Sequence, residues 1–155
     1  MRLSSAGLEL IESFEGLRLE AYPDPGTGGD PWTIGYGHTG PDVHKGLVIT
    51  EVKANELLRG DVERFEQCVS SFVTPSINQN EYDALVSFTY NVGTTAFVNS
   101  TLLRLLNAGE PRSTVAEQFG RWVKGGNGET LAGLVTRREK ESKLFLTPVK
   151  KNTFS

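Results

Sequence analysis

Cysteine is nearly absent from this chain of 155 residues, in which Cys68 is the single example. One thiol excludes a disulfide within the chain, which suits a reducing compartment. A lone cysteine is either a reactive thiol or a small core residue, and the position of Cys68 in a helical apolar pattern predicts the core residue. Stability must then come from a buried core, and a chain of this length buries on the order of two-thirds of its unfolded surface.

Long apolar runs are also missing. The N-terminus, Met1 to Ser5, lacks the uninterrupted apolar run of a signal peptide. No stretch reaches the roughly 18 to 20 apolar residues that a membrane span needs. We therefore expect no stable membrane insertion.

The sequence also lacks an excess of basic residues. It has 16 Lys and Arg against 19 Asp and Glu, which gives a net charge of −3. Proteins that bind nucleic acid carry a basic face, so this balance argues against a nucleic-acid partner. It also offers no simple electrostatic attraction to an anionic polymer. We expect ligand binding to rest on hydrogen bonds and stacking in a cleft.

The most informative stretch runs from residue 14 to residue 40. Before it, apolar residues recur at helical spacing, and Ser4 or Ser5 is placed to cap a helix that ends at Glu15. Gly16 follows at once, where a helix end uses a residue able to adopt positive φ. Glu15 then lies beside Phe14 at the negative end of the helix dipole, where a carboxylic acid keeps its proton more readily and suits a general acid.

A twisted hairpin is predicted next. Apolar residues alternate along residues 17–21 and again along residues 32–36, and a turn rich in proline and glycine separates the two runs. Asp24 lies at the base of this turn, and Thr33 re-enters on the opposite strand with a hydroxyl suited to hold a water. Gly35 and Gly37 mark either a close approach of ligand to the backbone or a bend in the sheet.

The remaining chain is predicted to be mostly helical, which makes the fold class α+β. One helix of about 20 residues over residues 51–72, with Thr50 as its cap and a mild bend at Gly60, should connect a small sheet lobe to a helical lobe. Its apolar stripe comprises Ala54, Leu58, Val62, Phe65, Val69 and Phe72. Further helices are expected after the capping residues Asn78, Ser100 and Thr130, and along residues 115–123.

Histidine and arginine positions leave alternatives open. His38 and His44 with Asp42 resemble a metal pair, but no third ligand stands at convincing spacing, so we expect no metal site. His38 is instead expected to tie the hairpin to Asp61 or Glu63. Arg137 and Arg138 form either a solvated face paired with neighbouring glutamates or a positive group near Glu15.

The motif residues together resemble the phage-type lysozymes, glycoside hydrolase family 24. The resemblance rests on Glu15-Gly16, on Asp24 nine residues further, and on the run from Thr33 to His38. It continues weakly through Asn91-Val92-Gly93 and residues 133–138, and covers residues 4 to 146. It implies that Glu15 is the general acid, Asp24 the second carboxylate and Thr33 the holder of the attacking water.

One departure from the family pattern concerns the turn. Family members have a shorter connection between the aspartate and the threonine, whereas nine positions separate Asp24 from Thr33 here. Asp30 lies within the extra residues and competes for the role of second carboxylate. We favour Asp24, because its spacing from Glu15 is kept.

The resemblance implies a lysozyme-like domain over residues 1–146, followed by a tail over 147–155. Its parts would be a small lobe (15–50), the connector helix (51–72), a helical lobe (73–146) that includes the N-terminal helix, and a cleft between the lobes. Gly35, Tyr36 and Gly37 would bind substrate.

The implied function is a monomeric muramidase acting on bacterial peptidoglycan without metal or cofactor. The enzyme would stay in the host cytoplasm until it is released to the cell wall. Two alternatives remain, a lytic transglycosylase acting on the same bond and a catalytically inactive wall-binding relative.

Overall fold

The computed structural model describes residues 1–149 and has the predicted mostly helical α+β architecture. Of the predicted tail, residues 150–155 lie outside the described residues. In chain order the elements are α1 (Ser5–Glu15), β1 (Arg18–Tyr22), β2 (Thr33–Gly35), β3 (His38–Thr39), α2 (Glu51–Asp61), α3 (Glu63–Phe72), α4 (Gln79–Val92), α5 (Thr94–Val98), α6 (Thr101–Asn107), α7 (Arg112–Glu117), the 3-10 helix η1 (Gln118–Arg121) and α8 (Ala132–Leu146).

Two compact units divide the chain. One is Leu8–Glu63, and the other combines Met1–Gly7 with the chain from Arg64 onward. The boundary falls inside the predicted connector helix and inside α1. The single catalytic domain over residues 1–146 stays a prediction.

The unit Leu8–Glu63 is built on a small antiparallel sheet with strand order β1-β2-β3. Its core is Ala21, Ile34 and Val43, with α2 packed against β2. The segment after the sheet returns to β1, because the amide of Ala21 donates to the carbonyl of Leu47 at 2.9 Å. Partly buried apolar side chains complete this core: Trp32, Leu47, Ile49 and Leu57.

The predicted connector helix is wrong in one respect, because α2 and α3 are separate helices with Val62 between them. Gly60 lies two residues before the interruption, and glycine is among the weakest helix formers. Thr50 caps α2 as predicted, accepting a hydrogen bond from the amide of Lys53. The predicted apolar stripe is buried as far as Val69, but Phe72 is 45% exposed.

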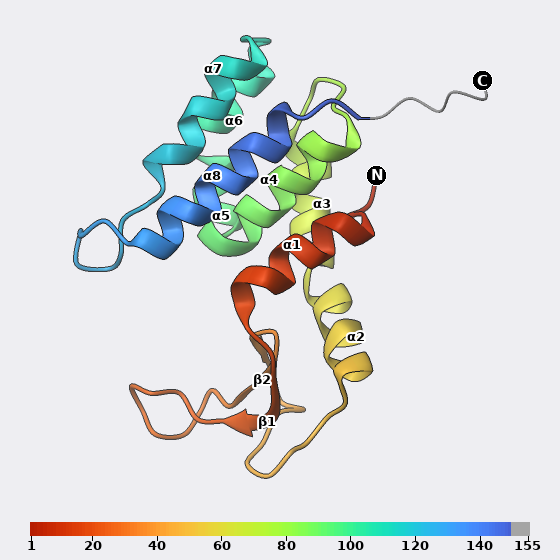
Figure 1. Cartoon of the computed structure of the whole chain (residues 1–155), viewed down its shortest axis with the longest axis vertical. Helices are drawn as coiled ribbons and strands as arrows, with labels where there is room; N and C mark the ends of the chain where they lie inside the picture. The colour runs from red at the N-terminus through yellow and green to blue at the C-terminus, as the bar shows by residue number, and fades with distance from the viewer. Residues whose placement is uncertain (150–155) are drawn as a thin grey trace, which may run out of the picture. The chain divides into compact units, whose positions relative to one another are not determined.

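Helix α4 is the core helix of the second unit, as predicted. Its capping box is present: the Asn78 side chain accepts from the Glu81 amide, and the Glu81 side chain accepts from the Asn78 amide. Nine consecutive residues, 81–89, are buried. Helices α4 and α8 lie side by side (Figure 1), so α4 is covered where a surface helix would meet water.

Aromatic rings fill the space around α4. Phe88 meets Phe119 edge to face with centroids 5.3 Å apart, and meets Trp122 at 5.7 Å. Phe119 in turn contacts Phe145 of α8 at 5.6 Å. Each such pair contributes about 0.5 to 1.5 kcal/mol beyond the burial of its area. These contacts join α4, η1 and α8 into one core.

Two helix boundaries differ from prediction. The helix expected along residues 115–123 ends earlier, as α7 followed by η1. Thr130 does not cap the last helix: α8 begins after Leu131, and Thr130 forms a bridge with Lys124. The glycine-rich segment between them closes a tight turn, in which the amide of Gly125 donates to the carbonyl of Glu129 at 2.8 Å. This pairing prevents the helix from starting at residue 130.

Within the described part of the chain, no helix is long and apolar enough to cross a membrane.

Candidate active site

Glu15 is the last residue of α1, as predicted. The helix starts at a cap in which Ser4 Oγ accepts a hydrogen bond from the amide of Gly7 at 3.1 Å. Gly16 has φ +63°, a conformation that L side chains rarely adopt. The chain therefore turns away directly after Glu15, which leaves this half-buried residue at the helix end.

Asp24 opens the turn between β1 and β2, and its carboxylate is tied to the backbone of that turn. Oδ2 accepts hydrogen bonds from the amides of Gly26 at 3.0 Å and Thr27 at 3.1 Å. The main-chain carbonyl of Asp24 accepts from the amide of Gly28 at 2.8 Å. This arrangement is an Asx turn that fixes the carboxylate direction. Oδ1 accepts no hydrogen bond among residues 1–149, and so it is available to a ligand or water.

Thr33 begins β2 and is paired on both sides, with Tyr22 of β1 and Thr39 of β3. Residues directly opposite in an antiparallel sheet share a face, so three hydroxyl-bearing side chains form a row across it. The next residue, Ile34, is fully buried on the opposite face. The Oγ1 atom of Thr33 lies 3.5 Å from the carbonyl of Pro31, too long for a strong hydrogen bond. The hydroxyl therefore retains the capacity to bind a water.

The second candidate carboxylate, Asp30, is exposed in the same turn. Its main-chain carbonyl accepts from the hydroxyl of Thr27 at 2.7 Å. Its carboxylate makes no hydrogen bond to any residue of the described range. Asp24 is thus the more rigidly held of the two carboxylates.

The three predicted substrate-binding residues lie at the end of β2 and in its connection to β3, a strand that was not predicted. Gly35 and Gly37 have φ of +66° and +87° and make the connection possible. A Cβ atom at Gly35 would lie 3.4 Å from the Cβ of Ala54, so Gly35 faces α2. Tyr36 is 7% exposed, and Gly37 is exposed. This geometry favours the sheet-bend interpretation of the glycines, and the substrate-binding role stays a prediction.

His38 lies between two carboxylates. Its Nδ1 is 2.8 Å from Oδ2 of Asp61 on α2, which selects Asp61 over the alternative Glu63. Its Nε2 is 3.0 Å from Oδ2 of Asp42. Burial lowers the pKa of His38, but hydrogen bonds to Asp61 and Asp42 outweigh it and the net shift is upward. The same hydrogen bond from His38 lowers the pKa of Asp42.

Sequence reasoning did not find Asp42 as a partner of His38. The sequence grouped Asp42 with His38 only as possible metal ligands.

A group of acidic side chains that the sequence did not single out surrounds Glu12, one turn before Glu15 in α1. Burial, and then the charges of Glu9 and Glu51, raise the pKa of Glu12. Burial and the charges of Glu12 and Glu51 likewise raise the pKa of Tyr36. The charge of Arg59 on α2 acts in the opposite direction and lowers the pKa of Glu12.

Arg137 and Arg138 are not on a solvated face, because they are 4% and 1% exposed. Arg137 Nε donates to Glu141 Oε2 at 3.1 Å, and Arg138 forms an ion pair with the same carboxylate. Arg138 also donates to the carbonyl of Trp122 at 2.9 Å. The predicted pairing with a neighbouring glutamate is confirmed, but the predicted solvation is wrong, since α4 and η1 pack against α8. The prediction that one of them approaches Glu15 stays a prediction.

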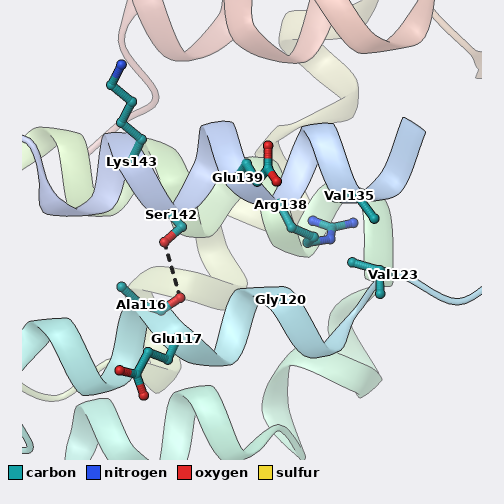
Figure 2. Close-up of a pocket in the computed structure, with 9 residues that line it drawn as sticks. All are labelled: Ala116, Glu117, Gly120, Val123, Val135, Arg138, Glu139, Ser142 and Lys143. Atoms are coloured by element: carbon teal, nitrogen blue, oxygen red, sulfur yellow. Dashed lines mark hydrogen bonds between the residues drawn. The ribbon is translucent and has the colours of Figure 1, made fainter. Parts of the chain in front are cut away.

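A cavity of about 400 Å³ lies between α7, η1 and α8 (Figure 2). Val123, Val135 and the buried Arg138 line it. The Ser142 hydroxyl donates to the carbonyl of Ala116 at 3.2 Å across it. Arg138 and Ser142 are thus engaged by the fold itself, and the remaining charged side chains of the lining are Glu117, Glu139 and Lys143.

Metal binding was not expected, and within residues 1–149 no group of three or more His, Cys, Asp or Glu side chains could hold a metal ion.

Comparison with known proteins identifies relatives along nearly the whole chain. The endolysin of Bacillus phage B103 is 50% identical over 152 residues, which cover 98% of this chain and 57% of that endolysin. This chain therefore spans little more than half of that relative's length. The endolysin of Salmonella phage P22 is 42% identical over 151 residues, covering 95% of this chain and 99% of the relative.

Solved structures agree with the sequence relatives. The muramidase domain of SpmX from Asticaccaulis excentricus superposes with a TM-score of 0.87 at 41% identity, covering 95% of this chain and 99% of that domain. A family model described as phage lysozyme matches residues 12–141, which include Glu15, Asp24 and Thr33. The chain therefore belongs to the phage lysozyme family.

Proposed function

We propose that this chain is a muramidase that hydrolyses the β-1,4 bond between N-acetylmuramic acid and N-acetylglucosamine in bacterial peptidoglycan. Its role would be that of an endolysin, which lyses the host cell of a bacteriophage. One observation carries the proposal: a glutamate at a helix end, an aspartate fixed by an Asx turn and a threonine on the facing strand all belong to the unit Leu8–Glu63. Family membership supplies the substrate class.

Glu15 acts as the general acid. Its proton passes to the glycosidic oxygen while the bond from that oxygen to the anomeric carbon breaks, so that the leaving sugar departs as a neutral alcohol. Glu15 is placed for this role at the end of α1, directly before the turn at Gly16.

Asp24 and Thr33 direct the attacking water. The water oxygen forms the new bond to the anomeric carbon, and Asp24 takes the proton that the water loses. Oδ2 of Asp24 is occupied by turn amides, so Oδ1 is the atom that faces the water. The hydroxyl of Thr33, which makes no short hydrogen bond to Pro31, holds the same water from β2.

The sheet face that carries Thr33 suits a carbohydrate. Tyr22, Thr33 and Thr39 present hydroxyl groups in a row, and the guanidinium of Arg18 lies 4.6 Å from the centre of the Tyr22 ring on the same strand. Sugars are recognised by such hydroxyls together with ring faces. We infer that the polymer lies along this face and contacts the turn formed by Gly35, Tyr36 and Gly37, and that the enzyme works as a monomer without a cofactor.

The products of purified peptidoglycan test the proposal. Mass spectrometry of the digest should show hydrolysed fragments that end in a reducing N-acetylmuramic acid. Anhydro fragments would identify a lytic transglycosylase instead, and an unchanged polymer would identify an inactive wall-binding relative.

Glu15→Gln tests the general acid. The amide keeps the shape of the side chain but has no proton to give, so we expect less than a few per cent of the wild-type rate in a protein with an unchanged circular dichroism spectrum. Glu9→Gln is the matched control. Glu9 is exposed on the same helix, and its substitution by glutamine removes the same charge. A folded Glu15→Gln protein with substantial activity would refute the assignment.

A further inference from the structure

Asp42 reaches His38 across a glycine. The two residues are four apart, and Asp42 Oδ1 and Oδ2 lie 3.3 and 3.0 Å from His38 Nε2. A Cβ atom at Gly40 would lie 2.7 Å from Asp42 Oδ1, closer than side chains tolerate. Glycine at position 40 therefore leaves the space that the Asp42 carboxylate needs to meet the imidazole.

The contacts of His38 require both ring nitrogens to carry a proton. A neutral imidazole has one N–H donor and one acceptor, and the acceptor would face a carboxylate. Asp61 holds Nδ1 with both of its oxygens, at 2.9 and 2.8 Å, and its side chain is 29% exposed. Asp42 is 58% exposed and holds Nε2 at the longer distances. The contact with Asp42 is therefore the one lost when His38 loses a proton.

His38 also fixes a strand next to Thr33. Strand β3 has only two residues, and it pairs with β2 through Ile34 opposite His38 and Thr33 opposite Thr39. Asp61 belongs to α2, which packs on both strands. Two paired positions with β2 fix β3 only weakly. The contacts of His38 with α2 and with the following loop therefore decide where β3 lies.

We propose that protonated His38 is a positioning residue for hydrolysis, because its bridge from Asp42 to Asp61 holds β3 against α2, and β3 in turn fixes Thr33 of β2 through the pairing of Thr33 with Thr39. The assignment of the water to Thr33 rests on the proposed function. When His38 loses its proton, Asp42 separates first and residues 40–46 loosen, so the rate falls on the alkaline side.

The surrounding charges support this arrangement. The groups that face the pair are Asp61 and Lys53 from α2, and the positive charge of Lys53 adds to that of His38 in lowering the pKa of Asp42. Because the pKa of His38 is raised in the folded protein, its stabilising contribution is complete below the unfolded pKa near 6.5 and is lost as pH rises through the folded pKa. The contribution of Asp42 is lost at the opposite, acidic end.

Titration of the His38 ring by NMR tests the bridge itself. We expect the midpoint of His38 to fall by about half a unit or more in Asp42→Asn, since one of its two carboxylates is removed. Gly40→Ala should also lower the His38 midpoint, because the new methyl group displaces Asp42 without changing any charge. Since Gly40 has φ +151°, this variant strains the backbone as well, and Asp42→Asn is the variant that leaves the backbone unchanged. His44, the other histidine, is the internal control, and Glu117→Gln, an exposed site in the other unit, controls for the change in net charge.

The kinetic test asks whether the bridge positions Thr33. At neutral pH, Asp42→Asn and Gly40→Ala should each lower kcat about three- to tenfold with the half-saturating peptidoglycan concentration unchanged, because water alignment and not substrate binding is lost. The alkaline limb of their pH profiles should move to lower pH, and the amide resonances of Thr33 and Thr39 should shift.

Three results would overturn the proposal. The first is that neither variant changes the midpoint of the His38 titration. The second is that the midpoint changes while kcat does not, and the third is that the amide resonances of Thr33 and Thr39 stay unchanged. Absence of hydrolysis in the wild type would refute the proposed function instead, while the titration and the amide resonances would still report on the bridge.

Discussion

The amide of Thr27 donates to two acceptors of Asp24, the side-chain Oδ2 at 3.1 Å and the main-chain carbonyl at 3.3 Å. Asparagine at position 24 would keep an oxygen acceptor for this turn, and asparagine favours Asx turns as aspartate does. Asp24→Asn therefore removes the charge while keeping the local backbone. It is a cleaner probe of chemistry than Asp24→Ala, which would also release the turn.

We expect Asp24→Asn to lose most of the lytic activity, with the free energy of unfolding within about 0.5 kcal/mol of wild type. Asp30→Asn should keep activity close to wild type, because Asp30 is exposed and its carboxylate has no fixed direction. A turbidity assay on permeabilised bacteria measures both variants. The reverse ranking would mean that the long turn has transferred the role of the second carboxylate to Asp30.

Phe65→Ala should reduce stability by about 3 to 5 kcal/mol, the usual cost of removing a buried aromatic ring. Phe65 is 5% exposed, and its ring meets Tyr90 of α4 edge to face with centroids 5.1 Å apart. Phe72→Ala, at the exposed end of the same helix, is the control and should cost clearly less. Urea denaturation measures both, and a loss below about 1 kcal/mol for Phe65→Ala would contradict its place in the core.

Glu141→Ala should cost about 3 to 5 kcal/mol, because it leaves the buried guanidinium groups of Arg137 and Arg138 without their shared carboxylate. Glu139→Ala removes the same charge from an exposed position of α8 and should change stability by less than about 0.5 kcal/mol. Thermal and urea unfolding of the two variants measure the difference. Equal stabilities would show that the arginines find other partners.

The sequence predicted correctly those features of the fold that depend on residues close together in the chain, such as helix caps. The caps at Thr50, Asn78 and Ser100 were predicted correctly, because a side-chain acceptor and the amide that it binds lie within three residues of each other. Thr130 carries the same signal, yet it pairs with Lys124 across a glycine turn and does not cap α8. A capping signal is therefore reliable only where no other backbone partner is near.

In the candidate site, too, features set by neighbouring residues were predictable and features set by distant residues were not. The end of α1 at Glu15 was predictable, because Gly16 directly follows it and the helix pattern precedes it. Burial of Arg137 was not predictable, since arginine is mostly exposed and the carbonyl that it binds belongs to Ser87, fifty positions earlier. The Asx turn of Asp24 lay between these cases, because a turn was expected but not the direction of its carboxylate.

The stereochemistry of hydrolysis depends on what Thr33 does. In a retaining glycosidase the two carboxyl groups lie about 5 to 5.5 Å apart, so that one of them attacks carbon, whereas an inverting enzyme leaves about 6.5 to 9.5 Å for a water. A nucleophilic carboxylate has no use for a hydroxyl that holds water. Thr33 offers such a hydroxyl on β2, and its contact with Pro31 at 3.5 Å is too long to occupy it.

We therefore expect inversion at the anomeric carbon, so that the β-linked polymer gives the α-anomer first. Proton NMR of the new reducing end, recorded within minutes of adding enzyme and before mutarotation, distinguishes the two anomers. Thr33→Val is the informative variant, because it keeps the branched shape and the strand preference but removes the hydroxyl, and it should lower kcat more than it changes substrate binding. A β-anomer appearing first would make Asp24 a nucleophile, and Thr33 would then be a packing residue of the sheet.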